Sequence, residues 1–93
     1  MCIHYNIKVT GKVQGVWFRK HTFDKAIEMD LKGFVQNESD TSVYVEVEDS
    51  DVNRLQNFID WLYKGSPLSM VENVMVKKEK ICKDFTEFEI RRF

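Results

Sequence analysis

The spacing of apolar residues alternates along this chain between a period of two and a period near 3.6, and this alternation is the strongest constraint on its fold. Residues 3–9 (IHYNIKV) carry an apolar side chain at every second position, as in a strand with one buried face. Residues 18–31 carry apolar side chains three and four apart, which predicts an amphipathic helix. Its expected buried stripe is Phe23, Ala26, Ile27 and Leu31. Gly33 follows at the position of a helix-ending glycine.

The middle of the chain predicts a hairpin and a second helix. Residues 34–37 (FVQN) and 42–48 (SVYVEVE) have the composition of two strands, and the polar segment ESDT between them suits a turn. A second helix is expected to begin near Ser50 or Asp51, either of which can cap it, and to end before Pro67. The expected buried stripe of this helix is Val52, Leu55, Phe58, Ile59 and Leu62.

Two further strands are predicted at 71–78 and 85–92. Because each helix has a single apolar stripe, both helices must cover the same face of one sheet. The sequence therefore predicts an α+β, ferredoxin-like βαββαβ sandwich, with an antiparallel sheet, two helices on one face and a short extra C-terminal strand. A chain of 93 residues has room for one such core, so a single domain over 1–93 is expected.

Residues 11–19 (GKVQGVWFR) join the first strand to the first helix and combine two glycines with an arginine. The first N–H groups of a helix lack partners within it, and the helix dipole places positive charge there. Glycines let successive amides turn toward one anion, and the planar guanidinium of Arg19 can bind two phosphoryl oxygens. The glycine spacing matches neither a nucleotide P-loop nor a dinucleotide fingerprint. The segment predicts an anion site, with a plain surface connection and a solvated arginine as the alternative.

The overall charge argues against large anionic partners. Lys and Arg together number 14 and Asp and Glu 15, so the net charge is −1. This balance does not favour nucleic acid or an anionic membrane as the main partner, and the anion site must be local. No apolar run approaches the roughly 18 residues of a membrane span, and the N-terminal segment lacks a signal-peptide pattern. We expect a cytoplasmic protein.

The loop also resembles the signature of the acylphosphatase family, Gly-x-Val-Gln-Gly-Val-x-(Phe/Tyr)-Arg. Every fixed position is met, and the match ends on Phe18 and Arg19. A second family segment, Gly-aromatic-Val-x-Asn, is similar to GFVQN, which ends on Asn37. The segment KGSPLSMVENV (64–74) resembles the Lys-Gly-x-Pro run that ends the second helix of the family, and the closing FEIRRF resembles its last strand. The resemblance covers essentially the whole chain.

This resemblance implies an enzyme that hydrolyses the carboxyl–phosphate anhydride of small acyl phosphates to a carboxylate and inorganic phosphate, which would compete with substrate. It implies that Arg19 and loop amides hold the phosphoryl group and that Asn37 orients the attacking water. The loop residues concerned are Gln14, Gly15, Val16, Trp17, Phe18 and Arg19. It implies no metal, no cofactor and no phosphoenzyme. We expect a monomer, and a phosphate oxygen of the substrate is the candidate base because asparagine takes no proton at neutral pH.

Two positions depart from the family pattern, since Thr41 and Asp49 stand where the family carries glycine. Glycine favours a turn with positive φ at this position, so its replacement by Thr41 affects the turn and the angle of the hairpin that carries Asn37. Neither residue has an assigned chemical role, so activity is expected to survive.

Other polar residues have simpler interpretations. Without the motif, Asn37 would be read as a turn residue that bonds its own backbone. Trp17 is expected to pack against the helix start, although an aromatic ring at a site mouth could also meet an acyl group. His4 and His21 are expected on the surface or on a sheet face. Neither has a partner at the spacing typical of a metal site or a catalytic triad. The carboxylates Asp40, Glu46 and Glu48 have the pattern of a solvated edge.

Cys2 and Cys82 are expected to be two reduced thiols, because they lie in no metal-ligand spacing and disulfides are rare in cytosolic proteins. A Cys2–Cys82 disulfide is the alternative if their strands are neighbours.

Two other functions remain open. RNA-recognition motifs share the βαββαβ order, and KGFVQN (32–37) echoes their basic-Gly-aromatic signature, but that signature belongs on the third strand. Strong retention on heparin at low salt would favour that function. The second alternative is a relative of the acylphosphatase-like domains of larger enzymes, which would bind an acyl or carbamoyl phosphate without efficient turnover. Measurable turnover separates it from the enzyme.

Overall fold

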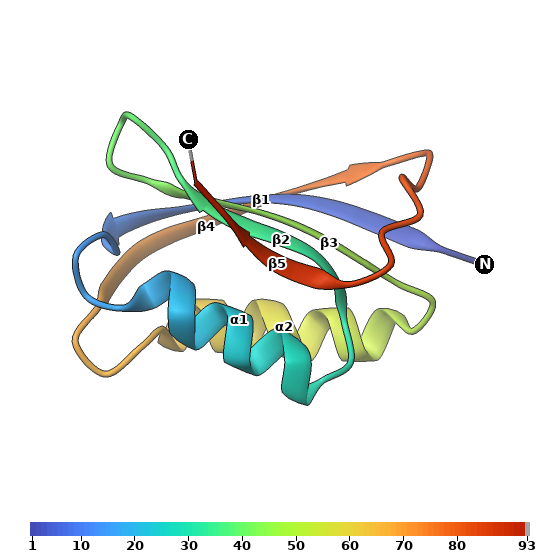
Figure 1. The fold of residues 1–93 in the computed structure, drawn as a ribbon, viewed down its shortest axis with the longest axis horizontal. Coiled ribbons are helices and arrows are strands. Elements are labelled where there is room, and N and C mark those ends of the chain that lie inside the picture. Colours follow the sequence, from blue (N-terminus) through green and yellow to red (C-terminus); the bar gives the residue numbers. More distant parts are fainter. Residues whose placement is uncertain (93) are drawn as a thin grey trace.

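The computed structural model describes residues 1–92, in which a five-stranded sheet carries two helices on one face (Figure 1). Phe93 lies outside the described residues. The elements in chain order are β1 (Ile3–Lys12), α1 (Phe18–Glu28), β2 (Lys32–Asn37), β3 (Val43–Asp49), α2 (Val52–Lys64), β4 (Met70–Glu79) and β5 (Phe88–Arg91). This arrangement confirms the predicted ferredoxin-like sandwich.

The strands lie in the order β4-β1-β3-β2-β5. β1 pairs antiparallel with both β3 and β4, and β2 pairs antiparallel with β3. The last strand, β5, pairs with β2 in the parallel sense, so the sheet is mixed and not wholly antiparallel as expected. The parallel pairing arises because β4 and β5 lie at opposite edges. Residues 80–87 must therefore cross the sheet before β5 begins, and we call them the connector.

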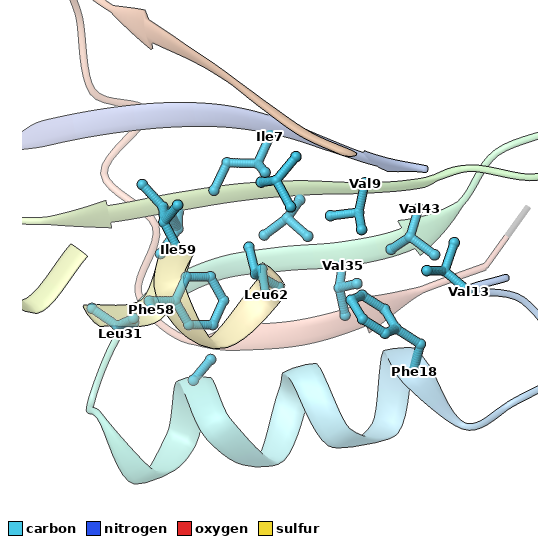
Figure 2. Close-up of a cluster of buried hydrophobic side chains, with 14 of the residues drawn as sticks. Ile7, Val9, Val13, Phe18, Leu31, Val35, Val43, Phe58, Ile59 and Leu62 are labelled. Atoms are coloured by element: carbon cyan, nitrogen blue, oxygen red, sulfur yellow. The ribbon is translucent and has the colours of Figure 1, made fainter. Parts of the chain in front are cut away.

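The core lies between the sheet and the helices, and Figure 2 shows its central side chains. Alternation places Ile7 and Val9 of β1 on this face, together with the odd-numbered valines of β3. The second helix buries Leu55, Phe58, Ile59 and Leu62, as predicted, whereas Val52 at its start is exposed. Asp51 caps α2 by accepting a hydrogen bond from the backbone N–H of Asn53 at 2.9 Å.

The first helix differs from its prediction. It ends at Glu28, and the residues it buries are Phe18, Thr22 and Ala26, whereas Ile27 is 53% exposed. The helix ends at this point because Asp30 adopts a left-handed conformation, with φ of 57°. Gly33 is therefore not the helix-ending glycine. It lies inside β2, where a Cβ would stand 1.9 Å from the carbonyl oxygen of Glu46 on the neighbouring strand.

Candidate active site

A pocket of about 410 Å³ lies where the loop before α1, the end of β2 and the end of β5 meet. Its lining residues are Val13, Gly15, Trp17, Phe18, Arg19, Lys20, Asn37, Ile90 and Arg92. Three of these side chains are cationic, and within the described chain none of the lining residues is a carboxylate or a histidine. In a protein of net charge −1, the pocket concentrates positive charge at one place.

The loop before α1 is held by two sets of contacts, one with the core and one with the β2–β3 turn. Val16 and Phe18 are buried, and the ring of Phe18 lies 6.1 Å from that of Trp61. Gln14 reaches the β2–β3 turn, where its Nε2 donates to the carbonyl oxygens of Glu38 at 2.8 Å and Ser42 at 2.9 Å. These contacts hold the loop at a set distance from the strand that carries Asn37.

The backbone of this loop takes the conformation of an anion-binding concavity. Gly15 and Trp17 both have positive φ, at 72° and 63°, between residues that do not. Within residues 1–92, the backbone N–H groups of residues 14–19 donate no hydrogen bond to another backbone or side-chain acceptor. A Cβ at Gly15 would meet nothing within 4 Å, so the glycine serves the conformation of the chain and leaves this side of the loop open.

The two cations of the first helical turn have different environments. Lys20 pairs with Asp24 one turn later, with its Nζ 2.7 Å from Oδ1. Arg19 has no ion-pair or hydrogen-bond partner among residues 1–92, and it lines the pocket. Its guanidinium is thus the cation of this turn that is available to a ligand.

Asn37 is the last residue of β2 and shares the helix-facing side of the strand with Val35. Its Oδ1 is buried and accepts no hydrogen bond from the described residues. The residue itself lines the pocket, so an asparagine amide with an acceptor unused by the described residues lies at this wall.

The turn after Asn37 keeps its positive φ although glycine is absent. Thr41 has φ of 76°, and its N–H donates to the carbonyl oxygen of Glu38 at 3.2 Å. Asp40 accepts from the backbone N–H of Ser42 at 3.1 Å and pairs with Lys8 at 2.7 Å. The hydrogen bond from Lys8 holds the pKa of the Asp40 carboxyl well below its ordinary value. These contacts hold the hairpin in the geometry that the glycine would favour.

The structure thus brings Gly15, Trp17, Phe18, Arg19 and Asn37 to one pocket. Of the other residues expected to bind phosphate, Gln14 and Val16 do not line it. The side chain of the first braces the β2–β3 turn, and that of the second is buried.

The structure also corrects one expectation and adds residues to the pocket. Trp17 does not pack against the helix start, because the residue is 71% exposed at the pocket wall. Sequence reasoning did not find Val13, Lys20, Ile90 and Arg92 in the pocket. The alternation in FEIRR, which places Arg92 on the same side as Phe88 and Ile90, is the signal that could have found the last of these.

Comparison with known proteins supports one family over nearly the whole chain. The acylphosphatase family model matches residues 5–90. The chain belongs to the acylphosphatase family. An acylphosphatase from Actinobacillus pleuropneumoniae is 40% identical over 84 residues, which is 90% of this chain and 92% of that protein. The crystal structure of acylphosphatase from Bacillus subtilis superposes with a TM-score of 0.91 at 33% identity, covering 99% of this chain and 100% of that one.

The same fold also occurs inside a much larger protein. Full-length HypF, solved in a phosphate- and nucleotide-bound form, matches 99% of this chain with 12% of its own length, at a TM-score of 0.86 and 32% identity. The acylphosphatases named above, in contrast, match over most of their own length. The chain is accordingly a hydrolase of the acylphosphatase family, whose substrates are small acyl phosphates. Over residues 1–92, no helix is both long and apolar enough to cross a membrane.

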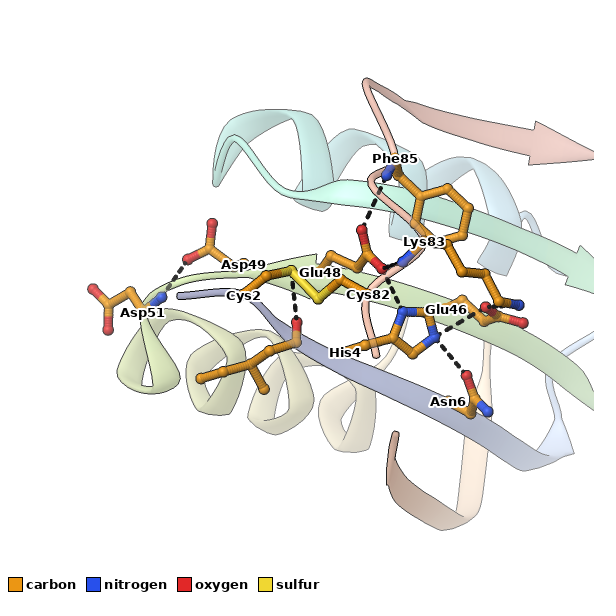
Figure 3. The surroundings of a disulfide bond; sticks show 11 residues. Cys2, His4, Asn6, Glu46, Glu48, Asp49, Asp51, Cys82, Lys83 and Phe85 are labelled. Atoms are coloured by element: carbon orange, nitrogen blue, oxygen red, sulfur yellow. Dashed lines mark hydrogen bonds and ion pairs between the residues drawn. A yellow bond between two sulfur atoms is a disulfide. The ribbon is translucent and has the colours of Figure 1, made fainter. Parts of the chain in front are cut away.

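The sheet face opposite the helices holds a second polar cluster, which is buried beneath the connector (Figure 3). His4, Glu46 and Glu48 are each about 95% buried or more, so the expectation of a solvated edge is wrong for the two glutamates, whereas Asp40 is exposed. The ring of His4 lies 3.0 Å from Oε1 of Glu46 and 2.6 Å from Oε2 of Glu48. From the connector, Lys83 Nζ lies 2.8 Å from Glu46, and the N–H of Phe85 donates to Glu48 at 3.0 Å.

The expectation of two reduced thiols is also overturned. Cys2 and Cys82 form a disulfide, with their Cα atoms 6.2 Å apart (Figure 3). The pairing is possible because β1 and β4 are neighbours and Cys82 lies in the connector just after β4. The bond ties the connector to the start of β1.

We expect the stability of the folded state to fall in acid because of Glu46 and Glu48. Burial alone would raise the pKa of both carboxyl groups. The hydrogen bond from Lys83 to Glu46, and those from His4 and the connector amides to Glu48, outweigh burial and lower both pKa values below the ordinary 4.5. A carboxyl with a lowered pKa stabilises the folded state above its unfolded pKa and loses that contribution as the pH falls through its folded pKa.

Urea titrations at several pH values should therefore show the free energy of unfolding decreasing progressively below about pH 4.5. The variant Glu48→Gln, which has one ionisable group fewer, should show a shallower decrease over the same range. Equal slopes in both proteins would remove Glu48 from the groups responsible.

Proposed function

We propose that this chain hydrolyses acyl phosphates by holding the phosphoryl group between the amides of residues 14–19 and the guanidinium of Arg19, while Asn37 positions the attacking water. One observation carries this proposal: a single cationic pocket without a lining carboxylate joins the N-terminal end of α1 to the end of β2. The arrangement suits a reaction in which placement and electrostatic stabilisation do most of the work.

Phosphoryl transfer requires little from a protein beyond placement of the reactants and stabilisation of negative charge. Its transition state is loose, with negative charge spread over the three non-bridging oxygens and the attacking and leaving oxygens roughly in line. Preorganised amides and a planar guanidinium stabilise that charge without reorganising during the reaction. The leaving group is a carboxylate, which departs without a general acid, so the lack of an acid among the lining residues is consistent with the proposal.

Asn37 positions the attacking water, and the substrate accepts its proton. The side-chain amide of Asn37, which lines the pocket, can hold a water molecule by hydrogen bonding and so fix its lone pair toward phosphorus. An amide does not take a proton at neutral pH, so a phosphoryl oxygen of the substrate receives it. Bond formation between water oxygen and phosphorus and cleavage of the phosphorus–carboxyl oxygen bond then yield inorganic phosphate and the carboxylate.

We further propose that the enzyme acts as a monomer in the cytoplasm, as a single domain over 1–93, without nucleic acid, membrane, metal or cofactor. In a reducing compartment the dithiol form of Cys2 and Cys82 would prevail, so activity is best measured with the cysteines both oxidised and reduced.

The proposal is tested by hydrolysis of benzoyl phosphate after dialysis against a chelator. We expect turnover without added metal and competitive inhibition by inorganic phosphate. In ¹⁸O-labelled water the label should enter phosphate and not benzoate, because attack occurs at phosphorus. Phosphate binding without turnover would favour the binding-domain alternative, and strong retention on heparin at low salt would favour RNA recognition.

Asn37→Ala is expected to lower kcat for benzoyl phosphate by about a hundredfold, the typical cost of misplacing a reacting group, while the inhibition constant of phosphate changes little. The matched control is Gln36→Ala, whose side chain lies on the opposite face of β2 and bonds to Glu38. It should retain native kinetics. A loss of phosphate binding in Asn37→Ala would contradict the assigned division of roles.

A further inference from the structure

We propose that Arg92 binds an anionic group on the acyl part of the substrate, so that the preferred substrates are acyl phosphates with a second negative charge, such as a carboxylate. This inference rests on the proposed function, because it takes the phosphoryl group to be held at the loop of residues 14–19. It assigns a role in substrate specificity to Arg92, which has no role in the proposed hydrolysis itself.

The position of Arg92 follows from alternation along β5. Phe88 is buried against the core and Ile90 lines the pocket, and Arg92 continues the same side of the strand into the pocket. Arg91 points to the other face, where its guanidinium lies 3.8 Å from the centre of the Phe34 ring. Its Nε also bonds to Glu89 at 2.9 Å. Two neighbouring arginines are thus sorted to opposite faces of the sheet.

The charges around the pocket leave Arg92 without a partner in the described chain. Lys20 is paired with Asp24 at 2.7 Å. Neither Arg19 nor Arg92 has an ion pair within residues 1–92, and no carboxylate is among the lining residues. Two cations that line one pocket repel each other, and this repulsion is relieved by a ligand with two anionic groups.

The two arginines come from different walls, and apolar side chains accompany them. Arg19 stands in the first turn of α1, whereas Arg92 follows β5, with the exposed ring of Trp17 and the side chain of Ile90 also in the lining. The loop amides and Arg19 bind the phosphoryl group, which leaves Arg92 for a second anionic group. The geometry therefore suits an acyl group with an apolar body that carries its own anion toward β5, where the planar guanidinium can bind a carboxylate through two hydrogen bonds.

The test compares three rigid substrates, namely benzoyl phosphate, 4-carboxybenzoyl phosphate and the neutral 4-carbamoylbenzoyl phosphate, with the 3-substituted pair measured alongside. A ring-bound carboxylate in these positions does not cyclise onto the anhydride. We expect kcat/KM of a carboxy substrate to exceed that of its carbamoyl analogue about fivefold in the native enzyme, as for one partly exposed charge pair, and the ratio to fall in 0.5 M salt.

The ratio should fall to about one in Arg92→Gln and stay at its native value in Arg91→Gln, which removes the same charge from the opposite face. Because it is a ratio within one preparation, it does not depend on the fraction of enzyme that is folded. A native ratio of one at both ring positions would overturn the inference. So would an Arg92→Gln variant that loses affinity for inorganic phosphate and slows all substrates equally, since Arg92 would then bind the phosphoryl group. If the native enzyme hydrolyses none of the three, the proposed function itself fails.

Discussion

Arg19→Ala should lower kcat/KM for benzoyl phosphate about a thousandfold, at the lower end of what removing a transition-state arginine costs in phosphoryl transfer. Arg19 lines the pocket, and among residues 1–92 it has no competing carboxylate, so its charge is available to the phosphoryl oxygens. Because charge on those oxygens is redistributed in the transition state, the loss should appear in kcat as well as in KM.

Two further variants distinguish the contribution of the planar guanidinium of Arg19 from that of its charge alone and from that of a neighbouring positive charge. Arg19→Lys keeps the charge without the planar fork and should recover only a small part of the activity. Lys20→Ala removes the adjacent cation, whose Nζ is held by Asp24, and should change kcat/KM by less than about threefold, within the range of one exposed charge pair. Native kinetics in Arg19→Ala, with the thermal transition unchanged, would remove the phosphate-binding role.

Loss of the Cys2–Cys82 disulfide is expected to lower the free energy of unfolding by about 4 kcal/mol, because the bond closes a loop of 80 residues and restricts the unfolded chain. For a domain of this size that loss corresponds to a decrease in Tm of more than about 15 °C. The fold itself should persist, since the hydrogen bonds from the connector to Glu46 and Glu48 do not require the sulfur bond.

Thermal unfolding with and without a phosphine reductant measures this effect. The double variant Cys2→Ser/Cys82→Ser should unfold near the temperature of the reduced native protein and should not respond to reductant. A difference below about 1 kcal/mol between the oxidised and reduced forms would show that the bond adds little to the interactions that already hold the connector.

The sequence predicts those elements whose apolar residues follow a single spacing, either every second residue in a strand or every three to four residues in a helix. The β2–β3 hairpin and most of the buried stripe of α2 follow from alternation and from helical spacing, and the cap of α2 is Asp51, one of the two residues expected there. The first helix is less well predicted, because Leu31 is buried although the helix has already ended at Glu28. Spacing alone does not reveal that end, which depends on Asp30 adopting a left-handed conformation.

What the sequence does not predict depends on the connector. Alternation correctly places His4, Glu46 and Glu48 on the polar face of the sheet, but their burial results from a segment some 35 residues or more away that crosses that face. The disulfide has the same origin. In the candidate site, the motif indicates Arg19 and Asn37, whereas Arg92 enters the pocket only because β5 is added next to β2.

The convergence of the loop amides and Arg19 on one phosphate is tested most directly by titrating ¹⁵N-labelled protein with inorganic phosphate and following amide and guanidinium resonances. We expect the largest saturable shifts at the N–H groups of residues 14–19 and at the Arg19 side chain, with a dissociation constant equal to the inhibition constant of phosphate. Shifts concentrated elsewhere, or no saturable shift in the loop at concentrations that inhibit the enzyme, would contradict the account.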